Sequence, residues 1–106
     1  MTEILFPPGP VLMTVEARVD SDHEDEFNRW YDEQHIPDVV SCPKFLAGAR
    51  YTSSDSKPRV YLALYVLEDE TAVETPELKR VSGFGHLTHH VTYERRLFRP
   101  RLSPPR

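Results

Sequence analysis

The amino-acid sequence predicts an α+β fold, in which two βαβ units build one four-stranded antiparallel sheet. Two observations support it. Four separate segments have the apolar pattern of strands, and helix-start signals occur after the first and third of them. The resulting βαββαβ order is the ferredoxin-like pattern. With 106 residues, we expect a single domain over 1–106, including an N-terminal arm over 1–9 and a C-terminal tail over 99–106.

The first half of the chain contains two predicted strands and one predicted helix. Every second residue of 11–19 is apolar, which predicts a strand with one buried face. Ser21 and Glu24 have the spacing of a capping box, and we expect a helix over 22–35 that ends before Pro37. After a loop, 45–52 is predicted to be the second strand.

The third predicted strand, 59–68, follows a turn-forming stretch over 53–58 and is apolar on both faces. One face carries Val60, Leu62, Leu64 and Val66, and the other carries Tyr61, Ala63, Tyr65 and Leu67. Helices on one side of a sheet cover only one face. We therefore expect the other face to contact a second copy of the chain in a homodimer.

The second predicted helix starts with Thr75 as cap and Pro76 as first helical residue. Gly83 and Gly85 are expected to end it, and the last strand is predicted over 87–98.

Composition excludes several classes of partner. The net charge is −4, which disfavours binding to nucleic acid or to an anionic membrane, and no apolar segment has the length of a membrane span. Cys42 is the only cysteine, so no internal disulfide can form. A reducing compartment is therefore expected, and we predict a cytoplasmic protein.

Four short motifs resemble the dimeric α+β barrel superfamily and, within it, the EthD-like branch. They are Trp30-Tyr31, His35-Ile36-Pro37, Pro43-Lys44-Phe45 and Arg50-Tyr51. Lys44 stands where the family pattern has glycine. The resemblance implies two sheets joined face to face in a dimer, an α+β barrel, with a ligand cavity between each sheet and its helices. Such families include cofactor-free monooxygenases, cyclases, isomerases, haem-handling enzymes and proteins of no known activity.

His35 is the first catalytic candidate. Phe27, Tyr31 and His35 are spaced four residues apart, so the imidazole is expected on the buried face of the helix, where it can act as a general acid or base. The alternative is a structural histidine that caps the helix C-terminus. Asp38 and Asp32 are candidates for orienting the ring, or are plain surface acids.

His86 is the second candidate acid or base, because it follows two glycines at a helix-to-strand junction. His89 is expected on the pocket side of the last strand, while His90 faces the other way. His86, His89 and His90 are poorly placed to bind one ion together, so we predict no metal ligands. We also predict no cofactor, because nucleotide-binding and zinc motifs are missing.

The remaining candidates bind substrate. Trp30 and Tyr31 are expected to form pocket walls, and Arg50, Tyr51 or Tyr65 to steady a developing oxyanion. For Tyr61 and Tyr65 the alternative is packing at the dimer interface.

These patterns favour a small cofactor-independent enzyme that performs acid–base chemistry on an aromatic or polyketide-like molecule. The reaction would be isomerisation, cyclisation, elimination or oxygenation. Two alternatives remain: a non-catalytic ligand-binding or accessory protein of a catabolic pathway, and a haem-binding protein.

Overall fold

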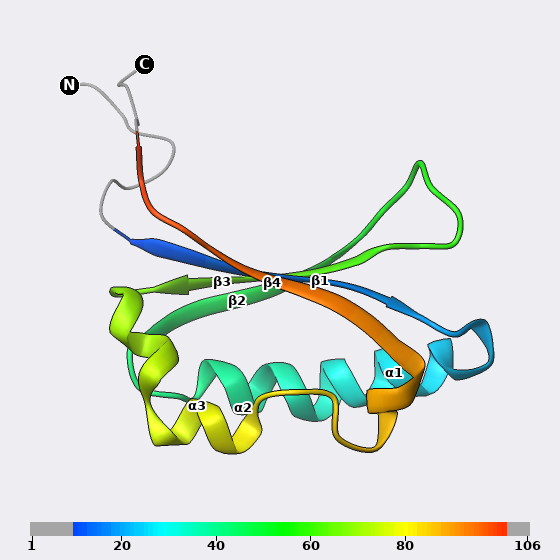
Figure 1. Cartoon of the computed structure of the whole chain (residues 1–106), viewed down its shortest axis with the longest axis horizontal. Coiled ribbons are helices and arrows are strands. Elements are labelled where there is room, and N and C mark those ends of the chain that lie inside the picture. Colours follow the sequence, from blue (N-terminus) through cyan, green and yellow to red (C-terminus); the bar gives the residue numbers. More distant parts are fainter. Residues whose placement is uncertain (1–9, 102–106) are drawn as a thin grey trace.

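A computed structural model describes residues 10–101 as a four-stranded antiparallel sheet with every helix on one of its faces (Figure 1). The strands are β1 (Val11–Val19), β2 (Phe45–Thr52), β3 (Tyr61–Leu67) and β4 (Val91–Phe98), in the order β2-β3-β1-β4. The predicted ferredoxin-like fold is confirmed. The expected arm over 1–9, and 102–106 of the expected tail, lie outside the described residues.

The first helix is longer than predicted and contains a π-helical turn. It consists of α1 (Glu24–Trp30), the π turn Tyr31–His35 and α2 (Ile36–Val40), after a 3-10 turn at Ser21–His23. The prediction that it ends before Pro37 is wrong. Proline cannot donate to the carbonyl four residues earlier and clashes with it in a regular α-helix. The wider turn directly before Pro37 accommodates this defect, so the helix continues.

The expected capping box does not form at the helix start. Neither the 3-10 turn nor α1 has a side-chain cap in the described part of the chain. The Glu24 carboxylate instead accepts hydrogen bonds from Tyr61 and Arg59, which fastens the helix start to β3.

The second crossover differs from expectation at both ends. An unpredicted 3-10 helix, Glu70–Glu74, precedes α3 (Pro76–Val81), whose predicted Thr75 cap accepts a hydrogen bond from the Leu78 amide at 3.2 Å. A 3-10 turn, Gly85–His90, occupies the predicted beginning of the last strand. Gly85 starts this turn at φ 52°, and the turn buries Leu87 under the sheet.

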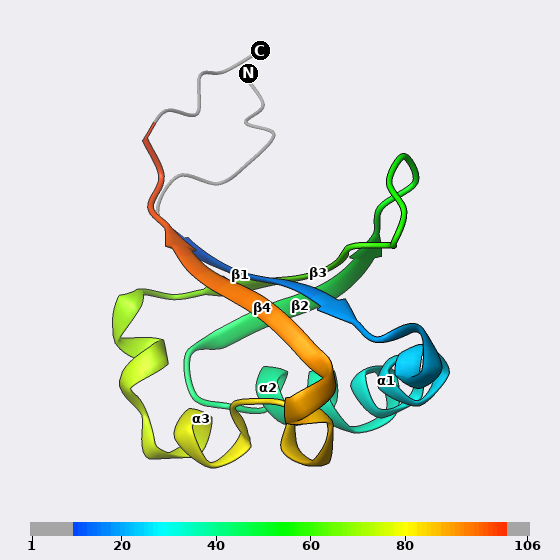
Figure 2. The same ribbon diagram turned by 45° about the vertical axis from the view of Figure 1, so that its right-hand side comes forward.

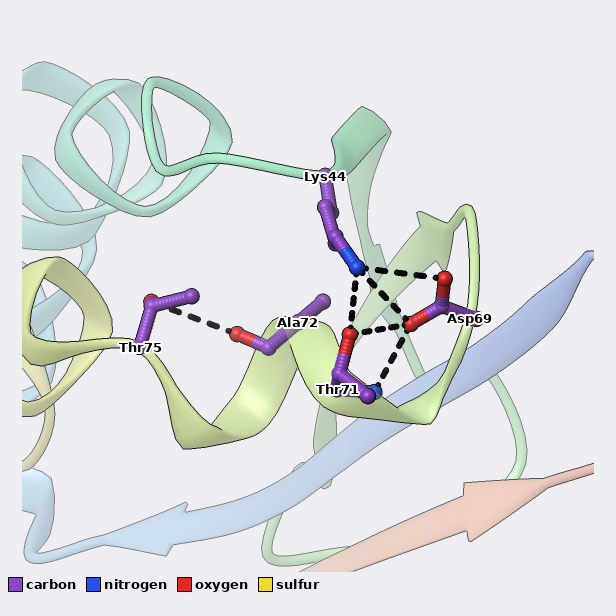
Figure 3. A network of polar contacts seen from close by, with 5 residues as sticks. All are labelled: Lys44, Asp69, Thr71, Ala72 and Thr75. Atoms are coloured by element: carbon purple, nitrogen blue, oxygen red, sulfur yellow. Dashed lines mark hydrogen bonds and ion pairs between the residues drawn. The ribbon is translucent and has the colours of Figure 1, made fainter.

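The loop before β2 is held by Lys44, the residue that replaces the family glycine. Lys44 adopts a φ of 70°, a conformation that glycine accepts more easily. Its ammonium group donates to Thr71 Oγ1 at 2.6 Å and contacts Asp69 Oδ2 at 3.3 Å (Figure 3). Asp69 also accepts from the Thr71 amide, which caps the 3-10 helix. The lysine therefore joins the two crossovers in a way that glycine could not.

The strand register separates the sheet into a covered and an open face. Val15 pairs with Ala63 on one side and Arg95 on the other, and these residues point toward the helices. Tyr61 and Tyr65 share that face and are buried, so the alternative that placed them at a dimer interface is wrong. Leu62, Leu64 and Val66 point to the open face, as expected, and are only partly buried. Figure 2 shows that no described helix covers this side.

No helix within 10–101 combines the length and apolar character that crossing a bilayer requires.

Gly48 lies where the end of the first helix packs tightly against β2 and β3. A Cβ built at this position would lie 2.7 Å from Val40 Cγ1 and 2.9 Å from Tyr65 Cδ1. Both distances are shorter than real carbon contacts, so β2 can carry no side chain here without displacing α2.

We expect Gly48→Ala to lower the free energy of unfolding by about 1–3 kcal/mol, the usual cost of overpacking. Urea denaturation measures the change. Adding Val40→Ala should restore part of the loss, since it removes the nearest atom. A Gly48→Ala protein as stable as the parent would contradict the close approach.

Candidate functional site

Two neighbouring hollows share His35 as part of their walls. The inner one, a cavity of about 310 Å³, lies between the sheet and the helices. Its lining consists of Met13, Val15, His35, Val39, Tyr65, Leu78, Ser82, Gly83, Phe84, Tyr93 and Arg95. The outer hollow, also about 310 Å³, lies between the first helix and the segment after α3. It is lined by Trp30, Gln34, His35, Asp38, Arg80, Val81, Ser82, Gly83, Gly85 and His86.

The residues common to both hollows are His35, Ser82 and Gly83. The imidazole therefore stands between the apolar interior of the domain and the polar outer hollow. A proton on this ring can be exchanged on one side with a molecule in the cavity and on the other with the outer hollow.

His35 is held by aromatic packing. Its ring stacks on Trp30, with centroids 4.5 Å apart and planes 16° from parallel, and meets the Tyr31 ring edge-on at 4.9 Å. The residue is 7% exposed, and no hydrogen bond to its side chain is found within 10–101. The helix does not end at His35, so the ring does not serve as its C-terminal cap.

Burial is the main electrostatic influence on His35 and lowers its pKa to about 4. Asp38, three residues further along the helix, opposes this by attracting a proton, and the Arg50 charge adds to the lowering. The imidazole is consequently neutral at physiological pH. Asp38 lines the outer hollow, where its carboxylate can act on His35 only through space.

His86 lines only the outer hollow and not the inner cavity. Its Nε2 lies 2.9 Å from Glu26 Oε2, and its ring faces the Trp30 ring edge-on at 6.3 Å. The two catalytic candidates thus share one hollow, while only His35 also reaches the inner cavity.

Two buried phenols lie deeper in the domain. Tyr65 lines the inner cavity, and Tyr31 packs behind His35 without lining either hollow. Neither hydroxyl has a hydrogen-bond partner among residues 10–101. Burial raises the pKa of Tyr65, and the neighbouring Tyr31 hydroxyl raises it further. Tyr65 therefore stays protonated, with its hydroxyl oxygen itself buried beside Tyr31.

Arg50 lies away from both hollows. Its guanidinium contacts Asp32 Oδ1 at 2.7 Å and Asn28 Oδ1 at 2.9 Å, and lies 4.3 Å from the Tyr31 ring centroid. Asn28, Asp32 and Arg50 border a separate polar hollow of about 450 Å³, which Tyr61 also lines. Asp32 thus forms an ion pair with Arg50, and within the described residues it makes no hydrogen bond or ion pair with His35.

Two more predicted substrate-binding residues point elsewhere. Tyr51 is 55% exposed and lies on the open face of the sheet, opposite the helices. His89 is exposed on the 3-10 turn before β4, so the expectation that it faces a pocket from a strand is wrong.

Of the residues that line the inner cavity, only His35 and Tyr65 were predicted site residues; Phe84, Tyr93 and Arg95 are among those that the sequence did not reveal. Phe84 is buried against Tyr93 at a centroid distance of 4.8 Å, and Arg95 supplies the only cationic side chain of the cavity lining. The alternation of Tyr93 and Arg95 along the last strand was visible, but pairing them with Ala17 and Val15 requires the strand order.

The comparisons with known proteins agree with this architecture. A family model described as Domain of unknown function (DUF4286) matches residues 11–94. The chain belongs to the DUF4286 family. None of the curated proteins matches it.

Solved structures show the same fold at low sequence identity. A variant of SnoaB, described as a cofactor-independent oxygenase from Streptomyces nogalater, matches with TM-score 0.68 and 19% identity, covering 89% of this chain and 95% of that one. An EthD family protein from Bacillus halodurans matches with TM-score 0.63, 12% identity and coverage of 80% and 95%. A monooxygenase of Streptomyces coelicolor, solved with nanaomycin D, matches with TM-score 0.57, 14% identity and coverage of 87% and 88%. The predicted resemblance to EthD-like proteins is confirmed at the level of the fold.

The burial of His35 predicts a pH-dependent stability. As the pH falls from 7 toward 4, the unfolded chain protonates this histidine near its ordinary pKa of 6.5, while the folded protein resists until about 4. The free energy of unfolding should fall by about 2–3 kcal/mol between pH 7 and pH 4. Below pH 4, His35 should cause no further loss.

Urea denaturation at several pH values measures the effect, and His35→Gln should remove this part of it. His89→Gln, which changes an exposed histidine, should leave it in place. Equal pH profiles for the parent and His35→Gln proteins would show that His35 titrates normally.

Proposed function

We propose that this DUF4286 protein is a small cofactor-independent enzyme that transfers protons at an aromatic or polyketide-like molecule bound in the inner cavity. One observation carries the proposal: a neutral, nearly buried imidazole, without a hydrogen-bond partner among the described residues, forms the wall between that cavity and a polar hollow.

The proton transfer uses the neutral state of His35. A substrate C–H or O–H bond breaks, and the proton goes to a ring nitrogen. Because the pKa is about 4, the imidazole is a weak base. The substrate must therefore carry an acidic proton, such as that of a phenol, an enol or a carbon between two carbonyls.

The cavity offers a partner for the anion left behind. Arg95 brings a positive charge to its lining. An anion formed beside His35 also raises the affinity of that ring for its proton, since opposite charges attract more strongly in an apolar setting. In the outer hollow, His86 and its Glu26 partner can relay the proton to water.

The comparisons support this class of chemistry. SnoaB is described as an oxygenase that needs no cofactor, and the Streptomyces coelicolor monooxygenase was solved with nanaomycin D. Isomerisation, cyclisation, elimination and oxygenation can each begin with the proton removal that is assigned to His35.

The proposal also includes a cytoplasmic location, which is expected from the single cysteine.

Two alternatives make different predictions. A non-catalytic ligand-binding protein would use the same cavity and tolerate His35→Gln. A haem-binding protein would ligate iron through His35 or His86 and show a Soret band when purified or reconstituted.

Turnover of acidic aromatic compounds tests the enzyme proposal. Naphthols, anthrones and aromatic 1,3-dicarbonyl compounds are incubated with the protein in air and under argon, with products identified by mass spectrometry. We expect His35→Gln to lower turnover by about a hundredfold or more, because a general base contributes at least that factor. Trp30 is the only tryptophan and stacks on His35, which lines the inner cavity, so its fluorescence reports binding there.

The matched control is His23→Gln, which changes a histidine outside both hollows and should leave turnover unchanged. Binding of these compounds without turnover by the parent protein would favour the non-catalytic alternative. Parent-like turnover by His35→Gln would remove His35 as the base.

The open face of the sheet supports the proposed homodimer. Its central residues, Leu12, Leu62, Leu64 and Val66, are apolar and only partly buried. A second copy packed face to face would bury them and build the expected α+β barrel.

We expect the parent protein to sediment as a dimer and Leu64→Lys to sediment as a monomer, because a buried ammonium group would oppose the interface. Lys57→Glu, in the loop beyond the sheet, is the control and should remain dimeric. A monomeric parent protein would contradict the proposal.

A further inference from the structure

Two histidines and an aspartate gather at the end of the molecule where β1 leads into the first helix. Asp20 and His23 belong to that connection, and His90 lies directly before β4. One ring nitrogen from each histidine and one carboxylate oxygen lie within 4.8 Å of one another. This cluster shares no residue with the hollows that contain His35.

The backbone holds the cluster in place. The Asp20 amide donates to the His90 carbonyl at 2.9 Å, which extends the pairing of β1 with β4. The His23 amide donates to the Asp20 carbonyl, also at 2.9 Å, as part of the 3-10 turn. The three side chains therefore start from fixed backbone positions, although His90 is 70 residues from Asp20 in sequence.

Side-chain contacts link the three residues in series. His90 Nδ1 lies 3.1 Å from Asp20 Oδ2, and the His23 ring stacks on the His90 ring with centroids 3.6 Å apart. His23 Nδ1 is buried and has no hydrogen-bond partner within the described chain. An unsatisfied buried nitrogen is costly. A bound cation would give this nitrogen a partner.

We propose that Asp20, His23 and His90 bind one divalent transition-metal ion of the Zn²⁺ class. Imidazole nitrogen and carboxylate oxygen suit Zn²⁺, Co²⁺ and Ni²⁺ and disfavour Mg²⁺ and Ca²⁺, which select oxygen ligands. Ligand atoms around tetrahedral Zn²⁺ lie roughly 3.3 Å apart, given metal–nitrogen bonds of about 2.0–2.1 Å. The ligand atoms now lie within 4.8 Å of one another, and the two rings are stacked, so binding requires rotation of an imidazole as well as of the exposed Asp20. Three protein ligands leave one position for water.

The ion would act as a staple between the start of the first helix and the start of β4. It would add to the backbone hydrogen bond, the Asp20–His90 ion pair and the ring stack that already connect these two segments. The site is independent of the proposed enzymatic activity, since it lies in a different part of the fold.

Calorimetry with Zn²⁺, and Co²⁺ absorption spectroscopy, test the site on untagged full-length protein. We expect one Zn²⁺ per chain, with a melting temperature that rises on binding and returns after chelation. His23→Gln and His90→Gln should each weaken binding at least tenfold, the range seen when coordination is disturbed. Asp20→Asn should also weaken it.

Two controls separate this site from adventitious binding. His89→Gln removes the exposed histidine next to His90, and His35→Gln removes the cavity histidine, so both should bind Zn²⁺ like the parent. Circular dichroism confirms that each variant is folded. Failure of the parent to bind Zn²⁺, or parent-like binding by both His23→Gln and His90→Gln, would overturn the proposal.

Discussion

The burial of Phe27, Tyr31, His35 and Val39 along one helix is the constraint on which the rest of the structure depends. Four-residue spacing exceeds one α-helical turn, so each step in a regular helix would rotate the stripe by about 40°. Over three steps the last residue would leave the buried face. The π turn at Tyr31–His35 holds more residues per turn and reduces this drift. One local irregularity thus keeps His35 aimed at the sheet and lets the helix continue through Pro37.

Most of the fold could be predicted because strands leave a simple signal. The bounds of β1 and β2 agree with the prediction to the residue, since alternation and flanking turn residues define both ends. The errors occurred where local signals conflict with tertiary packing. Pro37 usually ends a helix, and nothing in the neighbouring sequence reveals the π turn. The 3-10 turn before β4 was mistaken for strand because Leu87 is apolar and fits either pattern.

The candidate site was predictable only in part. Helical periodicity placed His35 toward the core, but the faces of β2 could not be assigned correctly. The register shifts between Phe45 and Ala47, which turns Arg50 toward the helices and Tyr51 away from them. Strict alternation from Phe45 would give the opposite result. The cavity contribution of Arg95 and the cluster of Asp20, His23 and His90 depend on β1 lying beside β4, which is a property of topology rather than of any short sequence pattern.

The spacing of the buried stripe also limits how the length of this chain can vary. Inserting or deleting one residue between Phe27 and Val39 would rotate everything beyond the change by about 100° about the helix axis and separate His35 from its cavity. The loop over 53–58, by contrast, extends beyond the sheet and away from the helices (Figure 2). Length changes there leave the core untouched. An alignment of homologous chains should therefore concentrate its gaps in this hairpin and leave the first helix uninterrupted.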